Sequence, residues 1–289
     1  MNLIVKPHDV APGDSGEVLS LSPADAGWEL IGFKVYRLQP GEYWTFENHG
    51  VESCVVLLGG RCDVTSNAGS WSDVGDRASV FDGKPHALYL PLDAKYTISA
   101  KTPLSFAIAT SRATEKFPAR HITPDDVMVE IRGDGNATRQ INKIIQPDFP
   151  ADKLLVVEVF TPSGNWSSYP PHKHDEHDLP NEADLEEVYY YQLSAPEGYA
   201  IQKVYTGDRR LDETLTVKHG ELVLIPEGYH PVVAPPGYDV YYLNVLAGSA
   251  RSMAASDDPD YAWVRDTWKE HPPVPMFPRQ ATPQAPVFR

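Results

Sequence analysis

Proline and glycine interrupt this sequence too often for long helices to form over most of its length. Of the 289 residues, 27 are proline, which is about 9% against a usual frequency of roughly 5%. Between these interruptions lie short runs of β-branched and aromatic residues, a pattern typical of an all-β sandwich or barrel. The runs predicted to form strands are residues 30–38, 53–58, 87–90, 96–100, 105–110, 154–161, 188–193, 200–205, 221–225 and 240–246.

One helix is predicted near the end of the chain. Asp258 can cap it, Pro259 suits its first turn, and residues 261–270 follow without a break. Residues 271–289 then contain six prolines in 19 residues, so they can neither continue a helix nor fill a central strand. We expect this Pro-rich tail to be an extended arm on a neighbour or a disordered segment.

Net charge excludes two classes of partner. The 25 basic and 40 acidic residues give −15, so no overall field attracts nucleic acid or an anionic membrane. No apolar run approaches the roughly 18 residues that a membrane span needs, and the first residues lack the apolar stretch of a signal peptide. We therefore expect a soluble, cytoplasmic protein. Cys54 and Cys62 lie in apolar runs and are expected to be buried thiols.

A polar stretch punctuated by glycine and proline, residues 132–150, separates two series of predicted strands. Similar punctuation recurs on each side of it, which indicates two copies of one β module. The first copy has Glu52, Gly59, Pro91, Asp93 and Tyr96, and the second has Glu187, Gly220, Pro226, Gly228 and His230. We expect two domains, over residues 1–140 and 141–270.

The segment PPHKHD contains the most informative side chains. Alternate residues of a strand share one face, so His172 and His174 can point into a barrel while Lys173 points away. Glu187 begins the alternating run EVYYYQL, and His230 follows the Pro226 to Gly228 turn. Three imidazoles and one carboxylate suit Zn, Fe, Mn, Ni or Cu better than Mg or Ca, and leave positions for water or substrate.

Each of these ligands has competitors. A lone HxH pair is more often solvated or packed than metal-bound, and the site is predicted only because Glu187 and His230 have a suitable strand context. Glu186 competes with Glu187, which we prefer because an apolar strand follows it at once. His177 lies in the acidic loop DEHDLPNEAD and is expected to be solvated.

Several long runs carry a resemblance to a known family. Gly220, Pro226, Gly228 and His230 resemble the second cupin motif. The runs LLVVEVFTPSGNWSSYPPHKHD, LEEVYYYQL, KVYTGDRRLDETLTVKHGELVLIPEGYHPVVAPPGY and YYLNVLAG resemble the 5-deoxy-glucuronate isomerase family of myo-inositol catabolism. This family is related to the 4-deoxy-L-threo-5-hexosulose-uronate ketol-isomerases of pectin breakdown. The match is dense over residues 154–248 and diffuse before residue 132.

The resemblance implies two tandem cupin domains, which are jelly-roll barrels. It also implies that His172, His174, Glu187 and His230 bind one divalent metal ion, with zinc preferred and Mn, Fe or Ni as alternatives. The sequence departs from the cupin pattern in two places. Twelve residues separate His174 from Glu187 where about four are usual, and only Tyr229 separates Gly228 from His230 where two residues are usual.

The first half resembles a cupin that has lost its metal. Glu52 keeps its six-residue spacing to Gly59, but only His49 precedes it, and Tyr96 stands where the second motif would place histidine. A metal would be underligated there. We expect the first half to be a scaffold that buries part of the second barrel.

The activity implied by the resemblance is aldose-ketose isomerisation between 5-deoxy-D-glucuronate and 2-deoxy-5-keto-D-gluconate. A divalent cation polarises the carbonyl and stabilises the enediolate, while a base moves the carbon-bound proton. Base candidates are Asp212, Glu213 and metal-bound hydroxide, although both acids could be exposed turn charges. Tyr191 could donate to substrate oxygens, although a tyrosine there is more often part of a barrel core.

An anionic substrate of a protein with charge −15 requires local cations. Lys203, Arg209 and Arg210 lie in or beside the strand and turn before the DET run, and arginine offers a bidentate fork for a carboxylate. Some of them could equally be solvated turn charges. Lys173 is a weaker candidate because it alternates outward.

Two other functions stay open at this point. The same ligands would suit an Fe-dependent cupin oxygenase, and a bicupin can be a non-catalytic sugar-binding protein. The charged run DRRLDET favours a polyhydroxylated acid over an apolar substrate, and the intact ligand set favours catalysis. The aromatic and proline residues near the termini permit a homo-oligomer.

Overall fold

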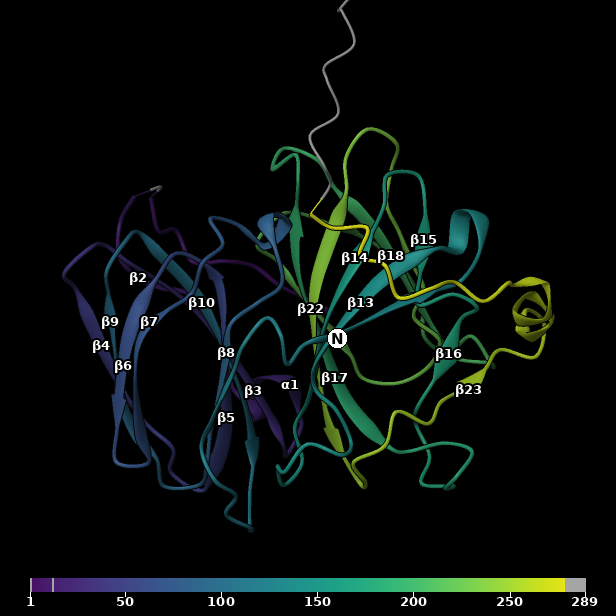
Figure 1. The fold of residues 1–289 in the computed structure, drawn as a ribbon. Helices are drawn as coiled ribbons and strands as arrows, with labels where there is room; N and C mark the ends of the chain where they lie inside the picture. The colour runs from purple at the N-terminus through teal and green to yellow at the C-terminus, as the bar shows by residue number, and fades with distance from the viewer. Residues whose placement is uncertain (1, 12, 279–289) are drawn as a thin grey trace, which may run out of the picture.

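The structure is a computed structural model that describes residues 2–11 and 13–278, and it consists mainly of β-strands (Figure 1). The strands form two units that lie side by side, each with a larger and a smaller sheet. The predicted all-β class is confirmed. Each run predicted to be a strand coincides with one strand, and the ends differ by a few residues at most.

The first unit pairs a six-stranded sheet with a four-stranded one. The larger sheet has the order β11 (Arg120–Ile122), β8 (Ala87–Leu90), β5 (Val51–Gly59), β10 (Leu104–Arg112), β3 (Ile31–Leu38) and β2 (Gly16–Leu21). The smaller sheet has the order β4 (Tyr43–Glu47), β9 (Lys95–Ala100), β6 (Cys62–Ser66) and β7 (Gly69–Val74). Side chains of both sheets form one buried core between them.

The second unit repeats this arrangement. Its seven-stranded sheet has the order β1 (Ile4–Val5), β20 (Leu222–Ile225), β17 (Leu185–Leu193), β22 (Val240–Gly248), β14 (Leu155–Thr161), β13 (Arg139–Ile145) and β12 (Met128–Arg132). Its four-stranded sheet has the order β15 (Trp166–Ser167), β21 (Val232–Val233), β18 (Ala200–Tyr205) and β19 (Asp212–Val217). A separate pair joins β16 (His172–Lys173) to β23 (Ser256–Asp257).

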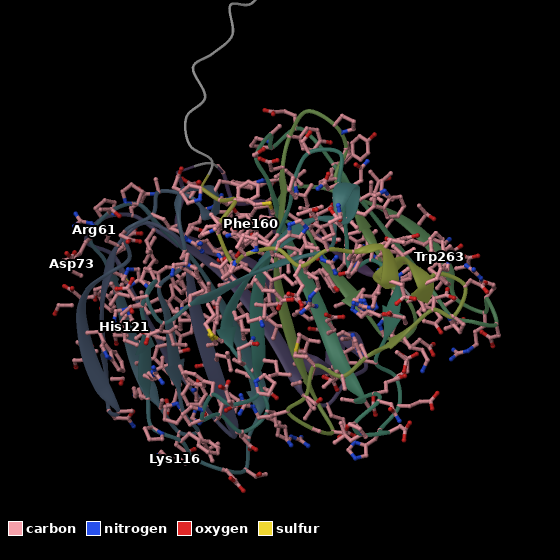
Figure 2. All side chains as sticks on the ribbon, turned by 45° about the vertical axis from the view of Figure 1, so that its right-hand side comes forward. Arg61, Asp73, Lys116, His121, Phe160 and Trp263 are labelled. Atoms are coloured by element: carbon pink, nitrogen blue, oxygen red, sulfur yellow. The ribbon has the colours of Figure 1, made fainter. Side chains whose placement is uncertain are left out.

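The two large sheets pack against each other, and their facing side chains form the largest buried cluster of the described chain. Phe160 of β14 lies in this cluster, between the two units (Figure 2). The central strands are therefore buried on both faces, which explains why their sequences are almost continuously apolar. Cys54 belongs to the same cluster, and both cysteines are buried and free, as predicted.

Strands that the sequence did not reveal lie mostly at the edges of the sheets. The β4 strand and the β19 strand are edge strands, and most of their residues are exposed or half-buried. A solvated edge strand needs no apolar run, so its sequence resembles that of a loop. The run DETLTV, whose two acids were considered above as either catalytic bases or turn charges, forms the β19 strand.

Residues 132–150, interpreted above as a boundary, contain the whole of β13 and the end of β12. Both strands belong to the large sheet of the second unit, and so does β1 at the start of the chain, which pairs with β20. We propose that the second unit includes residues 4–5 and begins by residue 128. Along the chain, β1 thus belongs to the second unit, β2 to β11 form the first unit, and the strands from β12 onward form the rest of the second unit.

The predicted C-terminal helix is shorter than expected and has 3-10 geometry. It spans η3 (Ala262–Thr267), and no side chain caps its N-terminus. Asp258 does not serve as the cap, because its carboxylate accepts a hydrogen bond from the Tyr205 hydroxyl at 2.6 Å. The other helices are α1 (Pro23–Ala26), η1 (Val80–Asp82) and η2 (Gly135–Ala137). No helix in the described ranges is long and apolar enough to cross a membrane.

The first part of the Pro-rich tail lies on this chain's own second unit. The side-chain oxygen of Gln140 accepts hydrogen bonds from the backbone N–H groups of Met276 and Phe277, at 2.6 Å and 2.9 Å. The Phe277 ring stacks on Phe160, with 5.0 Å between the ring centroids. Residues 271–278 are extended, and the rest of the predicted tail, 279–289, lies outside the described residues.

One buried and one half-buried carboxylate join the two units in a reciprocal way. Glu52 of β5 is fully buried, and its carboxylate accepts the backbone N–H groups of residues 152, 153 and 154, just before β14, at 2.8, 2.6 and 2.8 Å. Tyr89 donates to the same carboxylate at 2.6 Å. Glu186 of β17 accepts the N–H groups of residues 29, 30 and 31, at the start of β3, at 2.8, 3.1 and 2.8 Å. Each unit thus supplies a carboxylate that accepts hydrogen bonds from the backbone at the start of a strand in the other unit.

Replacing Glu52 with glutamine removes a charge that satisfies three backbone donors, so we expect the free energy of unfolding to fall by about 2–3 kcal/mol. Urea denaturation of metal-free protein measures this value. Glu47→Gln is the matched control, because Glu47 lies on exposed strand β4 and makes only long ion pairs. We expect its effect to stay within about 0.5 kcal/mol. Equal losses for both variants would contradict the proposed lock.

Candidate functional site

Two strands and one turn of the second unit bring the predicted ligands together. His172 lies on β16 and His174 directly follows that strand, while Glu187 lies on β17. Lys173 points away from the other two, as predicted, and its ammonium group lies 2.8 Å from the Glu182 carboxylate. His230 follows the turn between β20 and β21.

The turn before His230 depends on glycine. Gly228 has φ of 84°, and a Cβ atom at this position would lie 2.3 Å from the backbone oxygen of Tyr205. Only glycine adopts this conformation without strain or a clash. The N–H group of Gly228 donates to the Asp175 carboxylate at 2.9 Å, which connects the acidic loop after His174 to the His230 turn.

His174, Glu187 and His230 form a buried triad whose ligand atoms lie within 4.8 Å of one another. The Oε2 atom of Glu187 lies 2.7 Å from His174 Nε2 and 3.1 Å from His230 Nε2. His172 is half-buried beside the triad, with its ring centroid 4.8 Å from that of His230. The structure therefore brings all four predicted ligands to one place.

Hydrogen bonds to the far side of each ring turn its Nε2 atom toward the centre of this group. The Nδ1 atoms of His174 and His230 lie 3.0 Å from the Leu185 carbonyl oxygen and 2.8 Å from the Gly228 carbonyl oxygen. A carbonyl oxygen only accepts, so each Nδ1 carries a proton, and Nε2 is the atom that each ring presents to Glu187. Metal-binding histidines are typically oriented in this way.

The unpaired atoms of the site fit a metal ion. His230 Nε2 is buried and has no hydrogen-bond partner, because its contact with Glu187 lacks hydrogen-bond geometry. The other carboxylate oxygen of Glu187 accepts from the Asn244 amide at 2.6 Å. Two imidazole nitrogens that converge on a carboxylate oxygen form a donor set suited to a divalent transition metal. The triad can therefore hold such an ion.

Electrostatics keep Glu187 and His172 in the forms that bind metals. Burial raises the pKa of Glu187, but His174 and His230 outweigh burial and hold this pKa well below its usual value. Burial, together with the neighbouring His230, lowers the pKa of His172 well below that of free histidine. The carboxylate thus stays ionised and the His172 ring stays neutral.

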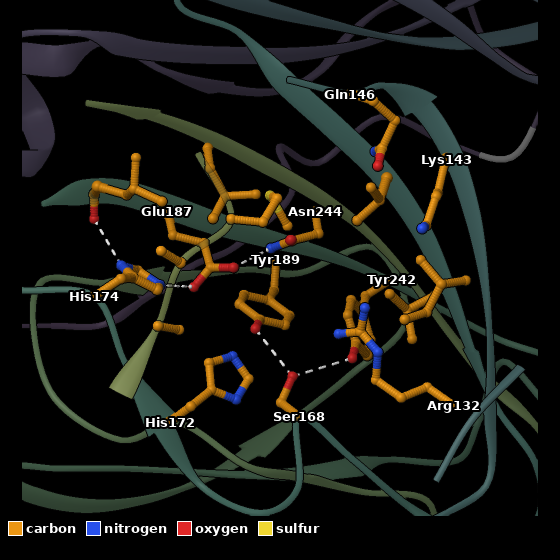
Figure 3. Close-up of a pocket in the computed structure, with 18 of the residues that line it drawn as sticks. Arg132, Lys143, Gln146, Ser168, His172, His174, Glu187, Tyr189, Tyr242 and Asn244 are labelled. Carbon is orange, nitrogen blue, oxygen red and sulfur yellow. Dashed lines mark hydrogen bonds and ion pairs between the residues drawn. The ribbon is translucent and has the colours of Figure 1, made fainter. Parts of the chain in front are cut away.

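The triad lies at one end of a cavity of about 230 Å³ inside the second barrel (Figure 3). Three hydroxyl groups line its middle. Ser168 Oγ lies 3.1 Å from the Tyr189 hydroxyl and 3.3 Å from the Tyr242 hydroxyl. Ser168 has φ of 47°, an unusual conformation for a residue with a Cβ atom and one often found at functional sites. Arg132 and Lys143 lie across the cavity from His172 and His174.

The other residues predicted to act on substrate do not line this cavity. Tyr191 points into the barrel core, where its hydroxyl donates to Gln202 at 2.9 Å. Asp212 and Glu213 lie at the exposed start of β19. Asp212 binds Lys203. The DRRLDET run lies outside the cavity because it forms a turn and an edge strand on the solvent side of the small sheet.

The predicted arginines also have partners outside the cavity. The Arg209 guanidinium lies over the Tyr205 ring, 4.1 Å from its centroid, and 3.7 Å from Asp212. Arg210 binds Glu227. The cavity's cations are instead Arg132, Arg139 and Lys143. The sequence contained a signal for two of them, because Arg139 and Lys143 alternate with Ile141 on one face of β13, within the stretch interpreted as a boundary.

In the first unit, strand register puts a serine where the second unit has Glu187. Glu187 pairs with Ile225, the last residue of β20, and Ser53 pairs with Leu90, the last residue of β8. Glu52 thus corresponds to Glu186 and not, as the spacing suggested, to Glu187. The Ser53 hydroxyl instead accepts from the Asn48 amide at 3.0 Å.

Comparison with known proteins agrees with this geometry. The family model described as "KduI/IolB family" matches residues 3–264. This chain belongs to that family. It is 47% identical over 265 residues to the 5-deoxy-glucuronate isomerase of Geobacillus thermodenitrificans, which covers 91% of this chain and 96% of the relative. The 5-deoxy-glucuronate isomerase of Bacillus subtilis (strain 168) is 40% identical over 266 residues, covering 91% and 98%.

Solved structures give the same assignment of fold. An IolB-like protein of Salmonella typhimurium LT2 superposes with a TM-score of 0.87 at 38% identity, over 91% of this chain and 99% of that chain. A variant of Bacillus subtilis oxalate decarboxylase superposes with a TM-score of 0.64 at 13% identity, over 89% and 79%. The second likeness concerns the fold alone. Both the family and the bicupin fold implied by the sequence are confirmed.

Metal binding is expected to depend on the triad. Dialysis against zinc should load about one ion per chain, measured by mass spectrometry of the digested protein. His230→Gln removes the buried unpaired nitrogen, so we expect it to lose most of this metal. His177→Gln is the control, because His177 is exposed and its ring contacts Ser249. Full metal content in the His230 variant would contradict the assigned site.

Glu130 provides a pH-dependent test of the cationic end of the cavity. Burial raises the pKa of Glu130, but Arg132 and Lys143 outweigh burial and lower it to about 2. A carboxyl whose pKa is depressed in the folded state stabilises the fold above its unfolded pKa, and this contribution is lost as pH falls from about 4.5 to 2. We expect Glu130→Gln to remove about 1–2 kcal/mol at pH 7 and little at pH 2, in urea denaturation followed across this range.

Proposed function

We propose that this chain is an aldose-ketose isomerase that interconverts 5-deoxy-D-glucuronate and 2-deoxy-5-keto-D-gluconate with the help of one divalent metal ion. The observation that carries this proposal is the near full-length similarity to proteins named 5-deoxy-glucuronate isomerase. The cavity supports it, because His174 and Glu187 of the metal-type triad line one small space together with hydroxyl groups and cations. This combination suits a short polyhydroxylated acid.

The reaction requires charge stabilisation and proton transfer. In the direction from aldose to ketose, the hydrogen on carbon 2 moves to carbon 1, and the hydroxyl hydrogen on oxygen 2 moves to oxygen 1. Negative charge develops on the two oxygens between these steps. His174, Glu187 and His230, with His172 as a further ligand, would hold a divalent ion, and that ion would supply Lewis-acid stabilisation of this charge. We take zinc as the first choice because the ligands are imidazoles and one carboxylate.

Tyr189 and Tyr242 are suited to donate hydrogen bonds to the reacting oxygens. Burial raises the pKa of both hydroxyls, so they remain protonated at neutral pH. Donors fixed in a buried cavity stabilise developing negative charge without reorganising. Ser168 contacts both hydroxyls, so a hydroxyl proton can pass between neighbouring oxygens along this chain. These three side chains take the place of Tyr191 in our proposal.

Asp212 and Glu213 are not retained as bases, because neither lines the cavity. Among the described residues that do line it, Glu187 is the one carboxylate, and it belongs to the metal-type triad. The described wall of the cavity therefore offers no carboxylate, apart from the candidate metal ligand Glu187, that could transfer the carbon-bound proton. The hydroxyl groups of Ser168, Tyr189 and Tyr242 line the cavity between the triad and the cations and can exchange protons.

We expect purified protein to convert 5-deoxy-D-glucuronate to its ketose, followed by NMR, and to lose this activity on chelation and recover it with zinc or manganese. Tyr242→Phe should lower kcat by about 10–100-fold because a donor to the developing oxyanion is lost. Tyr43→Phe is the control, since Tyr43 is exposed on the first unit. Full activity in metal-free protein would contradict the metal mechanism, and consumption of oxygen without isomerisation would indicate an oxygenase instead.

A further inference from the structure

The wall of the cavity opposite the triad carries an unusual concentration of positive charge. Arg132 at the end of β12 and Arg139 and Lys143 on β13 all line the cavity. Arg132 and Arg139 are paired across these two strands, so their backbones lie directly beside each other. Figure 3 shows the side chains of Arg132 and Lys143 on the side away from His172 and His174. The cavity therefore has a cationic end and a metal-type end.

One carboxylate compensates this charge only in part. Glu130 accepts from Arg132 Nε at 2.6 Å and from Arg132 Nη2 at 3.0 Å, and it also lies 2.8 Å from Lys143 Nζ. A single negative charge thus faces two cations. A second anion placed here would balance the remaining positive charge of Arg132 and Lys143. It would meet N–H donors of these side chains that Glu130 already holds in position.

Arg139 adds a third positive charge, and it is buried. Its side chain donates to the Ala137 carbonyl at 3.0 Å, and its guanidinium lies 5.3 Å from the centre of a Trp268 ring. No carboxylate of the described residues lies within ion-pair distance of it. Burial and the neighbouring Arg132 lower its pKa to about 9, which is the direction expected for a cation that lacks a compensating anion.

We propose that Arg132 and Lys143, with Arg139 behind them, bind the carboxylate of the sugar-acid substrate and select uronates over uncharged sugars. This inference rests on the proposed function. The substrate then lies along the cavity with its aldehyde end at the His174, Glu187 and His230 triad. Its hydroxyl groups face Ser168, Tyr189 and Tyr242, and its carboxylate meets the cations of β12 and β13.

This assignment replaces the cations suggested by the sequence. Lys203 and Arg210 are bound to Asp212 and Glu227 outside the cavity, so a substrate whose aldehyde reaches the triad cannot also contact them from inside. Arginine at the cavity wall offers a planar fork that matches a carboxylate, while lysine contributes a point charge. Together they recognise the terminal acid group and leave the reacting end of the sugar to the triad.

The test compares the acid substrate with a neutral analogue of the same length, the carboxamide of 5-deoxy-D-glucuronate. For Arg132→Gln and Lys143→Gln we expect KM for the acid to rise 10–100-fold, with kcat changed less than threefold. KM for the carboxamide should be high in the wild type and nearly the same in both variants. Arg132→Lys keeps the charge without the fork and should recover part of the loss.

Calorimetric binding of the acid to metal-loaded protein gives a second measurement and should weaken in parallel. Arg61→Gln is the control, because Arg61 pairs with Asp73 on the outer side of the first unit (Figure 2). An unchanged KM in both glutamine variants, with active wild type, would overturn the assignment, and a raised KM in Arg210→Gln would restore the sequence-based one. If the wild type does not isomerise the acid at all, the proposed function fails instead.

Discussion

The burial of strand β17 on both of its faces is the constraint on which the rest of the structure depends. Side chains of a strand alternate, so the neighbouring residues Glu186 and Glu187 point in opposite directions. Glu186 accepts three backbone N–H groups of the first unit, and Glu187 lies in the triad of the second. One strand thus joins the two units and positions the candidate metal site, and a shift of its register by one residue would exchange these roles.

The first unit supports the site without sharing its chemistry. Its large sheet covers the outer face of β17 and its neighbours, which removes that face from water and fixes the strands that carry Glu187 and Asn244. The register of the two units shows how their roles diverged. Where the second unit places a carboxylate in the barrel, the first places Ser53, while the carboxylate on the outer face occurs in both, as Glu52 and Glu186. The lock between the units is therefore repeated, and the triad occurs once in the described chain.

The two ends of the cavity differ in their chemistry. Converging imidazole nitrogens and a carboxylate occupy one end, and guanidinium and ammonium groups occupy the other. A sugar acid carries its carbonyl and its carboxylate at opposite ends of the chain, so this separation also fixes the direction in which it can bind. The strongly acidic net charge of the protein makes such a local arrangement necessary, because the protein as a whole repels an anionic substrate.

Local patterns were sufficient to predict the all-β class, most of the central strands and the four residues that meet at the candidate metal site. The strands were visible because burial on two faces requires continuous apolar runs, and the ligands because HxH and a glycine turn before histidine impose their own geometry. The edge strands were not visible, since solvated strands need no such pattern. The C-terminal helix was predicted too long, since only residues 262–267 are helical and they form a 3-10 helix.

The sequence by itself determined that His172, His174, Glu187 and His230 belong together, because each lies at a strand position or turn that short-range geometry defines. Only the tertiary structure decided which cations share their cavity. Arg132 and Lys143 reach it because β12 and β13 join the large sheet of the second unit, where β13 pairs with β14 and β12 pairs with β13. Lys203 and Arg210 are closer to His230 in sequence, but their strand and turn direct them to partners outside the cavity.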